Sequence, residues 1–415
     1  MCRLKYSIKI LAAAALIMSP AATAFAAETA PHDGASYPLS SLSSLSSPLT
    51  WRIGARVSGG FVPGTDGYLR GANSKGKNIE ASMAGGIRGE FSFSPDSRPG
   101  ILYCDTYQGL GVEDNSFFAN SLLGTPVSAY VYQGAPIVRF GDRLWLGYEW
   151  QFGAACGWKK YNEETNPDNA VVSSDVTAHM AVALKLNYEV SPKWRLSFGI
   201  EGRHFSNGNT SWPNAGVNTL GASVGLSYML GGKNVDAPSA ETSAALKAEA
   251  DRGRWIYDIV AFGAWRKRVV DLSGEQDRQL CPGKFAVAGI QFSPMRTLNR
   301  WVAVGPALDM QWDESADLAP NWIEGTSGDL IRFVRPGFGK QLSVGVTAHA
   351  ELTMPIFSVN VGLGVNILNP EGDRRFYQML NLKTFVTRRL FLNVGYRLGK
   401  FKDPQNLTLG VGVRL

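Results

Sequence analysis

The chain has little histidine and cysteine, and beyond its N-terminus it lacks long uninterrupted apolar runs. Only four histidines and four cysteines occur among 415 residues, and no two cysteines have Cys-x-x-Cys spacing. After residue 26 no segment approaches the roughly eighteen apolar residues that a membrane helix requires. The formal charge of +6 is modest and its basic residues are spread along the chain, which gives nucleic-acid binding little support. We therefore expect neither a disulfide-rich scaffold, nor membrane helices, nor a nucleic-acid partner.

The first residues have the features of an export signal. Three basic residues precede the short apolar core "ILAAAALIM", and "ATAFAA" offers small residues for cleavage. We expect residues 1–26 to be a signal peptide, followed by a low-complexity lead-in over 27–50. One disulfide could form among the three remaining cysteines, without any pairing being indicated, namely Cys104, Cys156 and Cys281.

Short runs of alternating apolar and polar residues dominate the rest of the chain. From Trp194 to Ile200 and from Leu220 to Tyr228, apolar side chains occupy even positions and polar or small ones occupy odd positions. Because side chains alternate across a strand, each such strand has one apolar face and one wet face. The strands are long, glycines and charges lie on the wet face, and aromatics cap the apolar face. In an exported chain this combination favours a membrane β-barrel over a soluble sandwich.

The chain also repeats itself. "DVTAHMAVALKL" near 175 resembles "GVTAHAELTMPI" near 345, and "NTLGASVGL" resembles "NLTLGVGVRL". We expect two tandem repeats of about eight antiparallel strands, over 51–231 and 253–415, joined by a linker over 232–252 that forms a short helix at most. Two small barrels and one barrel of about sixteen strands both satisfy the backbone. The single barrel is slightly favoured, because one closing strand ending at Leu415 is simpler to assemble.

One hairpin places polar side chains on the apolar face. His204 and Ser206 continue the even register of their strand, and Asn218 falls in the same register of the next strand. The segment 207–217 between them is rich in glycine, asparagine and proline, which predicts a loop. Polar groups that face hydrocarbon are costly, so these three residues are candidates for function.

Their chemistry matches that of a serine esterase. The Ser206 hydroxyl becomes a nucleophile when the His204 imidazole takes its proton, and an asparagine amide such as Asn218 can hold the imidazole in the required tautomer. The oxyanion needs donors, which the Asn207 side chain or backbone N–H groups such as that of Gly208 can supply. We expect activity to fall as His204 becomes protonated.

Other polar positions give weaker signals, and no metal site is predicted. His179 and His349 continue strand patterns without ligand-like spacing, so we expect structural roles for both. The acidic segment 311–318 is typical of a solvated loop more often than of a cation site. Residues 388–415 contain neither histidine nor serine, and Leu398 stands where His204 would align, so we expect no hydrolase site in the second repeat.

The hairpin "HFSNGNTSWPNAGVN" resembles the active-site hairpin of the lipid A 3-O-deacylase family, which is PagL-like and is also called acyloxyacyl hydrolase. Members of that family are outer-membrane β-barrels that remove an ester-linked acyl chain from lipid A. Their pattern of His-x-Ser-Asn followed by Pro-Asn-x-Gly is matched by His204, Ser206, Asn207, Pro213, Asn214 and Gly216. The resemblance extends over about 50–231, with the second half as a degenerate copy. It implies lipid A or lipopolysaccharide as the substrate and the outer membrane of a Gram-negative bacterium as the location.

The hairpin departs from that family at one position. Asn218 stands where the family has an acidic residue, fourteen positions after His204. A His-Ser-Asn set is instead similar to outer-membrane phospholipase A, a calcium-using barrel that cleaves phospholipid acyl esters. Phospholipid therefore stays open as an alternative substrate and calcium as a cofactor, although the sequence has no convincing calcium loop. A non-catalytic porin or structural barrel is the third alternative, and the oligomeric state is not predicted.

Overall fold

The computed structural model describes residues 49–231, 239–271, 278–281, 283–316, 318, 322–323, 332–333, 337–368, 375–401 and 403–415. The predicted signal peptide over 1–26 lies outside these residues, as does most of the lead-in over 27–50. Within the described part of the chain, no helix has the length and apolarity to cross a membrane.

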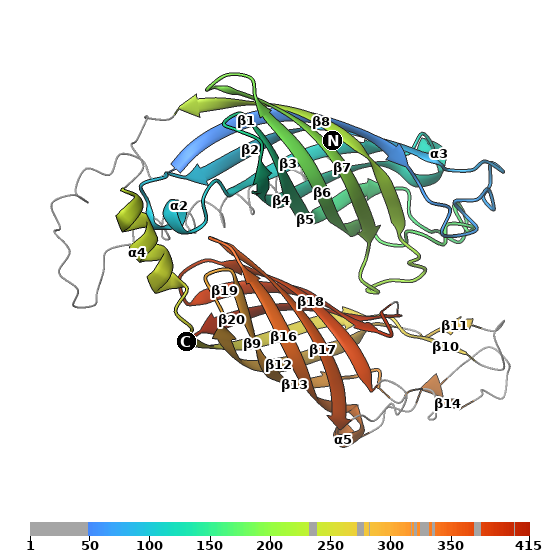
Figure 1. Cartoon of the computed structure of the whole chain (residues 1–415). Coiled ribbons are helices and arrows are strands. Elements are labelled where there is room, and N and C mark those ends of the chain that lie inside the picture. The colour runs from blue at the N-terminus through green and yellow to red at the C-terminus, as the bar shows by residue number, and fades with distance from the viewer. Residues whose placement is uncertain are drawn as a thin grey trace. The chain divides into compact units, whose positions relative to one another are not determined.

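Eight antiparallel strands of the first repeat form a closed barrel, which Figure 1 shows in blue to green. Each strand pairs with its neighbours along the chain, and β8 closes the barrel by pairing with β1. Two short helices, α2 (Arg98–Leu102) and α3 (Asn120–Leu123), lie between strands of this barrel. The strands are β1 (Leu49–Phe61), β2 (Ala81–Phe93), β3 (Tyr107–Ser116), β4 (Gly124–Arg139), β5 (Leu144–Trp158), β6 (Val176–Glu189), β7 (Trp194–Ser206) and β8 (Val217–Gly231).

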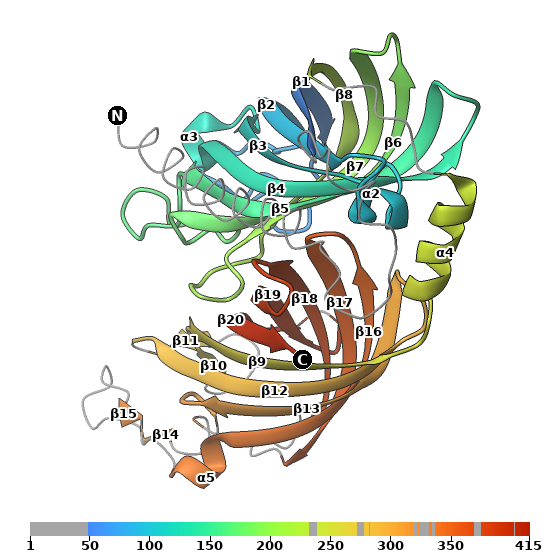
Figure 2. The same cartoon turned by 90° about the vertical axis from the view of Figure 1, so that its left-hand side faces the viewer.

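The second repeat forms a closed barrel of its own, whose curved strands are seen best in Figure 2. Its strands are β9 (Trp255–Arg266), β12 (Phe285–Thr297), β13 (Val302–Asp313), β16 (Leu342–Thr353), β17 (Phe357–Leu368), β18 (Phe376–Phe385), β19 (Leu390–Gly399) and β20 (Asp403–Arg414). Smaller elements lie before and between them, namely α4 (Ala240–Ala250), β10 (Val269–Asp271), β11 (Arg278–Leu280), β14 (Trp322–Ile323), β15 (Arg332–Phe333) and α5 (Phe338–Gln341). Of these, α4 falls within the predicted linker over 232–252.

The prediction of an all-β protein with two repeats of about eight strands is confirmed, but the preference for a single barrel of about sixteen strands is wrong. In each repeat the last strand pairs with the first strand of the same repeat, β8 with β1 and β20 with β9. Each sheet therefore satisfies its own edge groups, and no strand edge is left for the other repeat to complete.

The alternation in sequence becomes an apolar outer wall and a polar lumen. On β7 the side chain of Ile200 is 70% exposed, whereas Glu201, the next residue, is 4% exposed. The same contrast separates Leu220, which is exposed, from Ser223, which is buried, on β8. An exposed apolar wall around a closed barrel is the arrangement expected for a protein embedded in lipid.

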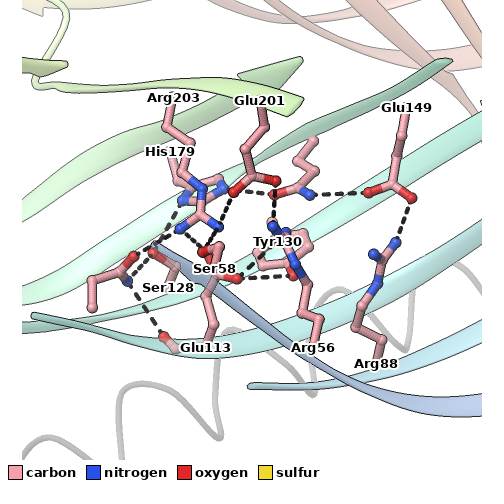
Figure 3. A network of polar contacts seen from close by, with 12 residues as sticks. Arg56, Ser58, Arg88, Glu113, Ser128, Tyr130, Glu149, His179, Glu201 and Arg203 are labelled. Carbon is pink, nitrogen blue, oxygen red and sulfur yellow. Dashed lines mark hydrogen bonds and ion pairs between the residues drawn. The ribbon is translucent and has the colours of Figure 1, made fainter. Parts of the chain in front are cut away.

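Ion pairs fill the lumen of the first barrel, as Figure 3 shows. Glu201 pairs with both Arg56 and Arg203, and Arg203 also lies 2.9 Å from Glu113. Farther along, Glu149 accepts hydrogen bonds from Arg88 at 2.7 Å and from Lys185 at 2.9 Å. Among the cavities of this barrel, two have volumes of about 10 and 30 Å³, enough for one and about two water molecules. Paired polar side chains therefore line its interior.

The connections at the two ends of the first barrel differ in length. One end has the tight turns 140–143 and 190–193 together with the segment 94–106, which contains α2. The other end has the loops 62–80, 159–175 and 207–216 together with the shorter connection 117–123, so its connections are longer on average. In membrane barrels the short turns face the periplasm and the longer loops face outward. The loop between β7 and β8 therefore lies at the outer surface.

Candidate active site

The hairpin of β7 and β8 brings two predicted site residues into direct contact. His204 and Asn218 are register partners across this hairpin, and His204 Nδ1 lies 2.7 Å from Asn218 Oδ1. Both side chains project outward from the barrel wall, in register with the exposed apolar residues Ile200 and Leu220. The structure thus places an imidazole and its hydrogen-bond partner where the barrel wall meets its outer loops.

This contact defines which nitrogen of the imidazole carries the proton. An amide oxygen only accepts hydrogen bonds, so His204 Nδ1 is the donor toward Asn218. In the neutral ring Nε2 then holds the lone pair, which is the form that a general base needs. Asn218 therefore orients the imidazole and sets its tautomer without bringing a charge to it.

Gly216 shows that Ser206 and His204 converge on one point. A Cβ atom built on Gly216 would lie 3.0 Å from His204 Cε1 and 3.5 Å from Ser206 Cβ. The same atom would lie 2.9 Å from the carbonyl oxygen of Phe205, and the backbone of Gly216 has a φ of +75°. Both the space and the backbone conformation therefore require glycine at this position. The serine and the imidazole stand on the same side of β7, facing this glycine.

The residues predicted to stabilise the oxyanion directly follow Ser206. The backbone N–H of Asn207 donates to Asn214 Oδ1 at 3.0 Å, and Asn207 Nδ2 donates to Ser173 Oγ at 3.2 Å. Gly208 has a φ of +62°, which turns the chain out of the strand. The single backbone hydrogen of Asn207 is already bonded, whereas its side-chain amide has two hydrogens, so this amide and the N–H of Gly208 are the donors that fit the predicted role.

An apolar cluster supports the hairpin from the lumen side. Phe205 and Val217, the inward-facing neighbours of the site residues, are 1% and 0% exposed. Phe205 meets Trp158 edge to face, with ring centroids 5.4 Å apart. We call this group the loop-end cluster; it consists of Val62, Tyr68, Leu69, Ile79, Phe117, Leu122, Leu123, Ala155, Trp158, Val171, Val172, Phe205 and Val217.

The loop between β5 and β6 fixes the second half of the hairpin loop. The backbone N–H groups of Ala215 and Gly216 donate to the carbonyls of Ala170 and Val171, both at 3.0 Å. These contacts, like that of Ser173 with Asn207, were not predicted, since they join segments far apart in sequence and no local pattern signals them. They hold Gly216 against the imidazole.

Two further histidines lie in the described residues, and both are buried in polar surroundings inside a barrel. His179 is fully buried in the first barrel, where it bonds Ser128 and Gln151 at 3.1 Å each and stacks on Tyr130 with centroids 4.9 Å apart. His349 is buried in the second barrel, with Nδ1 2.6 Å from Asn360 Oδ1.

The acidic segment 311–318 does not form a metal site in the described residues. Asp313 ends β13 and pairs with Arg266, while Asp317 lies outside the described residues. No group of three histidine, cysteine, aspartate or glutamate side chains in the described ranges is arranged to hold a metal ion. The three cysteines, Cys104, Cys156 and Cys281, are all free thiols.

The matching hairpin of the second barrel has neither the residues nor the loop of the first. Leu398 lies in β19 where His204 lies in β7, and a turn at Lys400 and Phe401 leads toward β20. Histidine and serine are absent from 388–415. The second barrel therefore does not repeat the constellation of the first.

Two family models match the chain, one for each barrel. The model described as lipid A 3-O-deacylase (PagL) matches residues 64–227. The model described as acyloxyacyl hydrolase, C-terminal domain, matches residues 255–415. No curated protein matches the chain.

Several solved structures are similar to the chain at low identity. An outer membrane channel from Pseudomonas putida F1 is 12% identical, with 93% of this chain and 98% of that chain covered and a TM-score of 0.18. CdiB from Acinetobacter baumannii is 12% identical, with 89% of this chain covered and a TM-score of 0.16, and the chain spans only 60% of its length. The siderophore receptor PirA from the same species is 9% identical, with coverages of 85% and 43% and a TM-score of 0.20.

Proposed function

We propose that this chain, which belongs to the lipid A 3-O-deacylase (PagL) family, is an outer-membrane serine esterase that removes one ester-linked acyl chain from lipid A. Ser206 is the nucleophile in this proposal, His204 the general base and acid, and Asn218 the residue that orients the imidazole. The observation that carries the proposal is the 2.7 Å contact between His204 Nδ1 and Asn218 Oδ1, beside Ser206 on the outer wall.

The reaction proceeds in two halves. Ser206 Oγ attacks the ester carbonyl carbon while His204 Nε2 takes the hydroxyl proton. The bond between the carbonyl carbon and the sugar oxygen then breaks, and the imidazolium returns the proton to that oxygen. Water attacks the acyl-serine with the same imidazole as base, which releases the fatty acid and restores Ser206.

The negative charge that develops on the carbonyl oxygen in each half needs hydrogen-bond donors. In this proposal the Asn207 side-chain amide and the N–H of Gly208 supply them, because they directly follow the nucleophile in the chain. The contact between Asn207 Nδ2 and Ser173 Oγ supports the role, since it fixes the amide plane before the substrate arrives.

The position on the outer wall suits a substrate that stays in the membrane. The site lies at the end of the barrel with the longer loops, and hence at the level of the outer-leaflet headgroups. A glycolipid acyl ester lies at that level, so it can approach the site by lateral diffusion, and it reaches Ser206, which is only 8% exposed, by entering beside His204. All proposed steps use this chain's own groups, and we therefore propose that no metal cofactor takes part.

Phospholipid is the second candidate substrate. It is favoured by Asn218, because an amide as third member matches outer-membrane phospholipase A better than it matches the acidic residue of the lipid A deacylases. A porin function of the first barrel is disfavoured by its lumen, where ion pairs surround cavities of about 10 and 30 Å³.

Mass spectrometry of lipid A and phospholipids tests the proposal in cells that express the wild type or Ser206→Ala at equal levels. We expect lipid A to lose one acyl chain with the wild type alone, and EDTA to leave the purified enzyme active. Accumulation of lysophospholipid instead would establish the second candidate. Unchanged lipids, with both variants folded in the outer membrane, would exclude catalysis.

A further inference from the structure

The two loops that flank the catalytic hairpin carry opposite charges. On the side of β8, which pairs with β1, the loop 62–80 exposes Arg70, Lys75 and Lys77. On the side of β7, which pairs with β6, the loop 159–175 exposes four acidic residues, namely Glu163, Glu164, Asp168 and Asp175. In strand order, the hairpin of β7 and β8 therefore has a basic loop on one side and an acidic loop on the other.

The charged side chains of the two loops differ in whether they already form contacts within the protein. In the acidic loop Lys160 pairs with Asp175 at 2.8 Å, and Lys159 Nζ donates to the carbonyl of Ser121 at 2.5 Å. Lys75 and Lys77 form no ion pair within the described part of the chain. Their ammonium groups are thus available to a ligand.

The basic loop also carries two acidic residues, which face their own loop. Asp66 accepts the backbone N–H of Tyr68 at 2.8 Å, and Glu80 accepts from Asn78 Nδ2 at 2.9 Å. Arg70 likewise bonds within the loop, donating to the carbonyl of Gly64 at 3.2 Å. Arg70 and Glu80 are exposed but already bonded within the loop, whereas the side chains of Lys75 and Lys77 are exposed at its tip.

The basic loop is built into the support of the catalytic hairpin. Its residue Tyr68 belongs to the loop-end cluster together with Phe205 and Val217, which flank the site residues. The Tyr68 hydroxyl lies 3.0 Å from the carbonyl of Leu122 and 3.1 Å from Asn166 Oδ1. Burial raises the pKa of Tyr68 to about 12, so the phenol keeps its proton and donates. The loop therefore has a fixed position relative to His204 and Ser206.

A single asparagine shapes the tip that presents the two lysines. Asn73 Oδ1 accepts the backbone N–H groups of Lys75 at 3.1 Å and Lys77 at 3.4 Å. Asn73 Nδ2 donates to the carbonyls of Tyr68 at 2.9 Å and Lys77 at 2.8 Å. Gly76, between the lysines, has a φ of +60°, which this tight turn requires. The tip is an ordered turn with both ammonium groups exposed.

We propose that Lys75 and Lys77 bind a phosphate group of the glycolipid headgroup while its acyl ester lies at Ser206. This inference rests on the proposed function and adds the orientation in which the substrate headgroup binds at the hairpin. Ammonium groups pair strongly with phosphate oxygens, whereas the carboxylates of the loop 159–175 repel them. The phosphate therefore lies on the β1 side of the hairpin, and the reverse orientation is excluded by charge.

Kinetics with paired substrates test this subsite. The values of kcat/KM are compared for phosphorylated lipid A and for the same glycolipid after phosphatase treatment, with wild type and the double variant Lys75→Gln/Lys77→Gln. We expect the wild type to prefer the phosphorylated substrate and the double variant to lose about tenfold of that preference. The preference of the wild type should also shrink with rising salt. Equal preferences in both proteins would overturn the proposal.

The control variant is Lys160→Gln, a lysine at the same end of the barrel that is already paired with Asp175. It should keep the wild-type preference, and a tenfold loss there as well would point to general surface charge instead of a subsite.

Binding to the inactive Ser206→Ala protein separates this inference from the proposed function. Vesicles that contain phosphorylated lipid A, its dephosphorylated form or a phospholipid are tested with and without the two lysine substitutions. Loss of binding to phosphorylated lipid A alone supports the subsite even in the absence of hydrolysis. An equal loss for phospholipid vesicles would assign the lysines to membrane phosphates in general and overturn the glycolipid subsite.

Discussion

His204 and Asn218 face each other across the β7–β8 hairpin, and a hydrogen bond of 2.7 Å joins the imidazole to the amide oxygen. The Asn218 amide orients the imidazole but brings no negative charge to it. A serine esterase built in this way orients its base as firmly as one with a carboxylate, yet it stabilises the transient imidazolium less.

Substitutions of Asn218 should separate these two contributions. We expect Asn218→Ala to lower kcat/KM by about 10²–10⁴-fold, because the imidazole loses the partner that sets its tautomer. Asn218→Asp keeps an acceptor oxygen and adds a charge, so it should be at least as active as the wild type. Initial rates of fatty-acid release measure both, and an Asn218→Ala enzyme with full activity would remove Asn218 from the mechanism.

The pH profile should change along with the rate. Only neutral His204 can accept the Ser206 proton, so wild-type activity should fall on the acid side. A carboxylate at position 218 favours the imidazolium, and the neutral ring then appears only at higher pH. We therefore expect the acid limb of the kcat/KM profile to move to higher pH in Asn218→Asp. An unmoved limb would indicate that the limb reports another group.

Gly216→Ala should damage the site without unfolding the barrel. The added Cβ would lie 3.0 Å from His204 Cε1 on a backbone with a φ of +75°, so the imidazole or the loop must shift. We expect a fall in kcat/KM of about 100-fold. The matched control is Gly202→Ala on the outer face of β7, where a Cβ meets no atom within 4 Å. Similar activities of the two variants would show that contact with Gly216 does not position the base.

Substitutions of the charged lumen residues should lower the stability of the barrel and leave its catalytic activity largely unchanged. Glu201→Gln removes one of the two buried carboxylates that Arg56 and Arg203 share, and leaves them only Glu113. We expect the free energy of unfolding to fall by about 2–3 kcal/mol, measured by urea titration in micelles. The exposed pair of Lys160 and Asp175 provides the control, because Asp175→Asn should cost less than about 1 kcal/mol. Equal losses would mean that the lumen pairs are solvated.

Much of the barrel was predictable because one periodicity encodes it. The exposed side chains of Ile200 and Leu220 lie in the even register that the sequence indicates, and extending that register across the loop brings Asn218 opposite His204. The two-residue period of a strand is enough to predict this pairing, because strand side chains alternate strictly between the two faces.

What alternation does not encode is which distant strands meet. Closure of β8 on β1 decides between one barrel and two, yet the pattern of each strand is the same in either arrangement. The contacts of Ser173 with Asn207 and of Val171 with Gly216 also join separate loops. Such contacts depend on the folded barrel, and irregular loops carry no periodic signal.

In the proposed mechanism His204 and Ser206 act from the outward register of β7, which would make catalysis a two-dimensional process. Substrate encounter then depends on how many substrate molecules share each unit of membrane area, and dilution of the whole suspension leaves that density unchanged. Inert lipid added to the same membrane slows the reaction by spacing the substrate molecules apart. The enzyme thus responds to the composition of the leaflet around it, and the released acid and the remaining glycolipid both start their next step inside that leaflet.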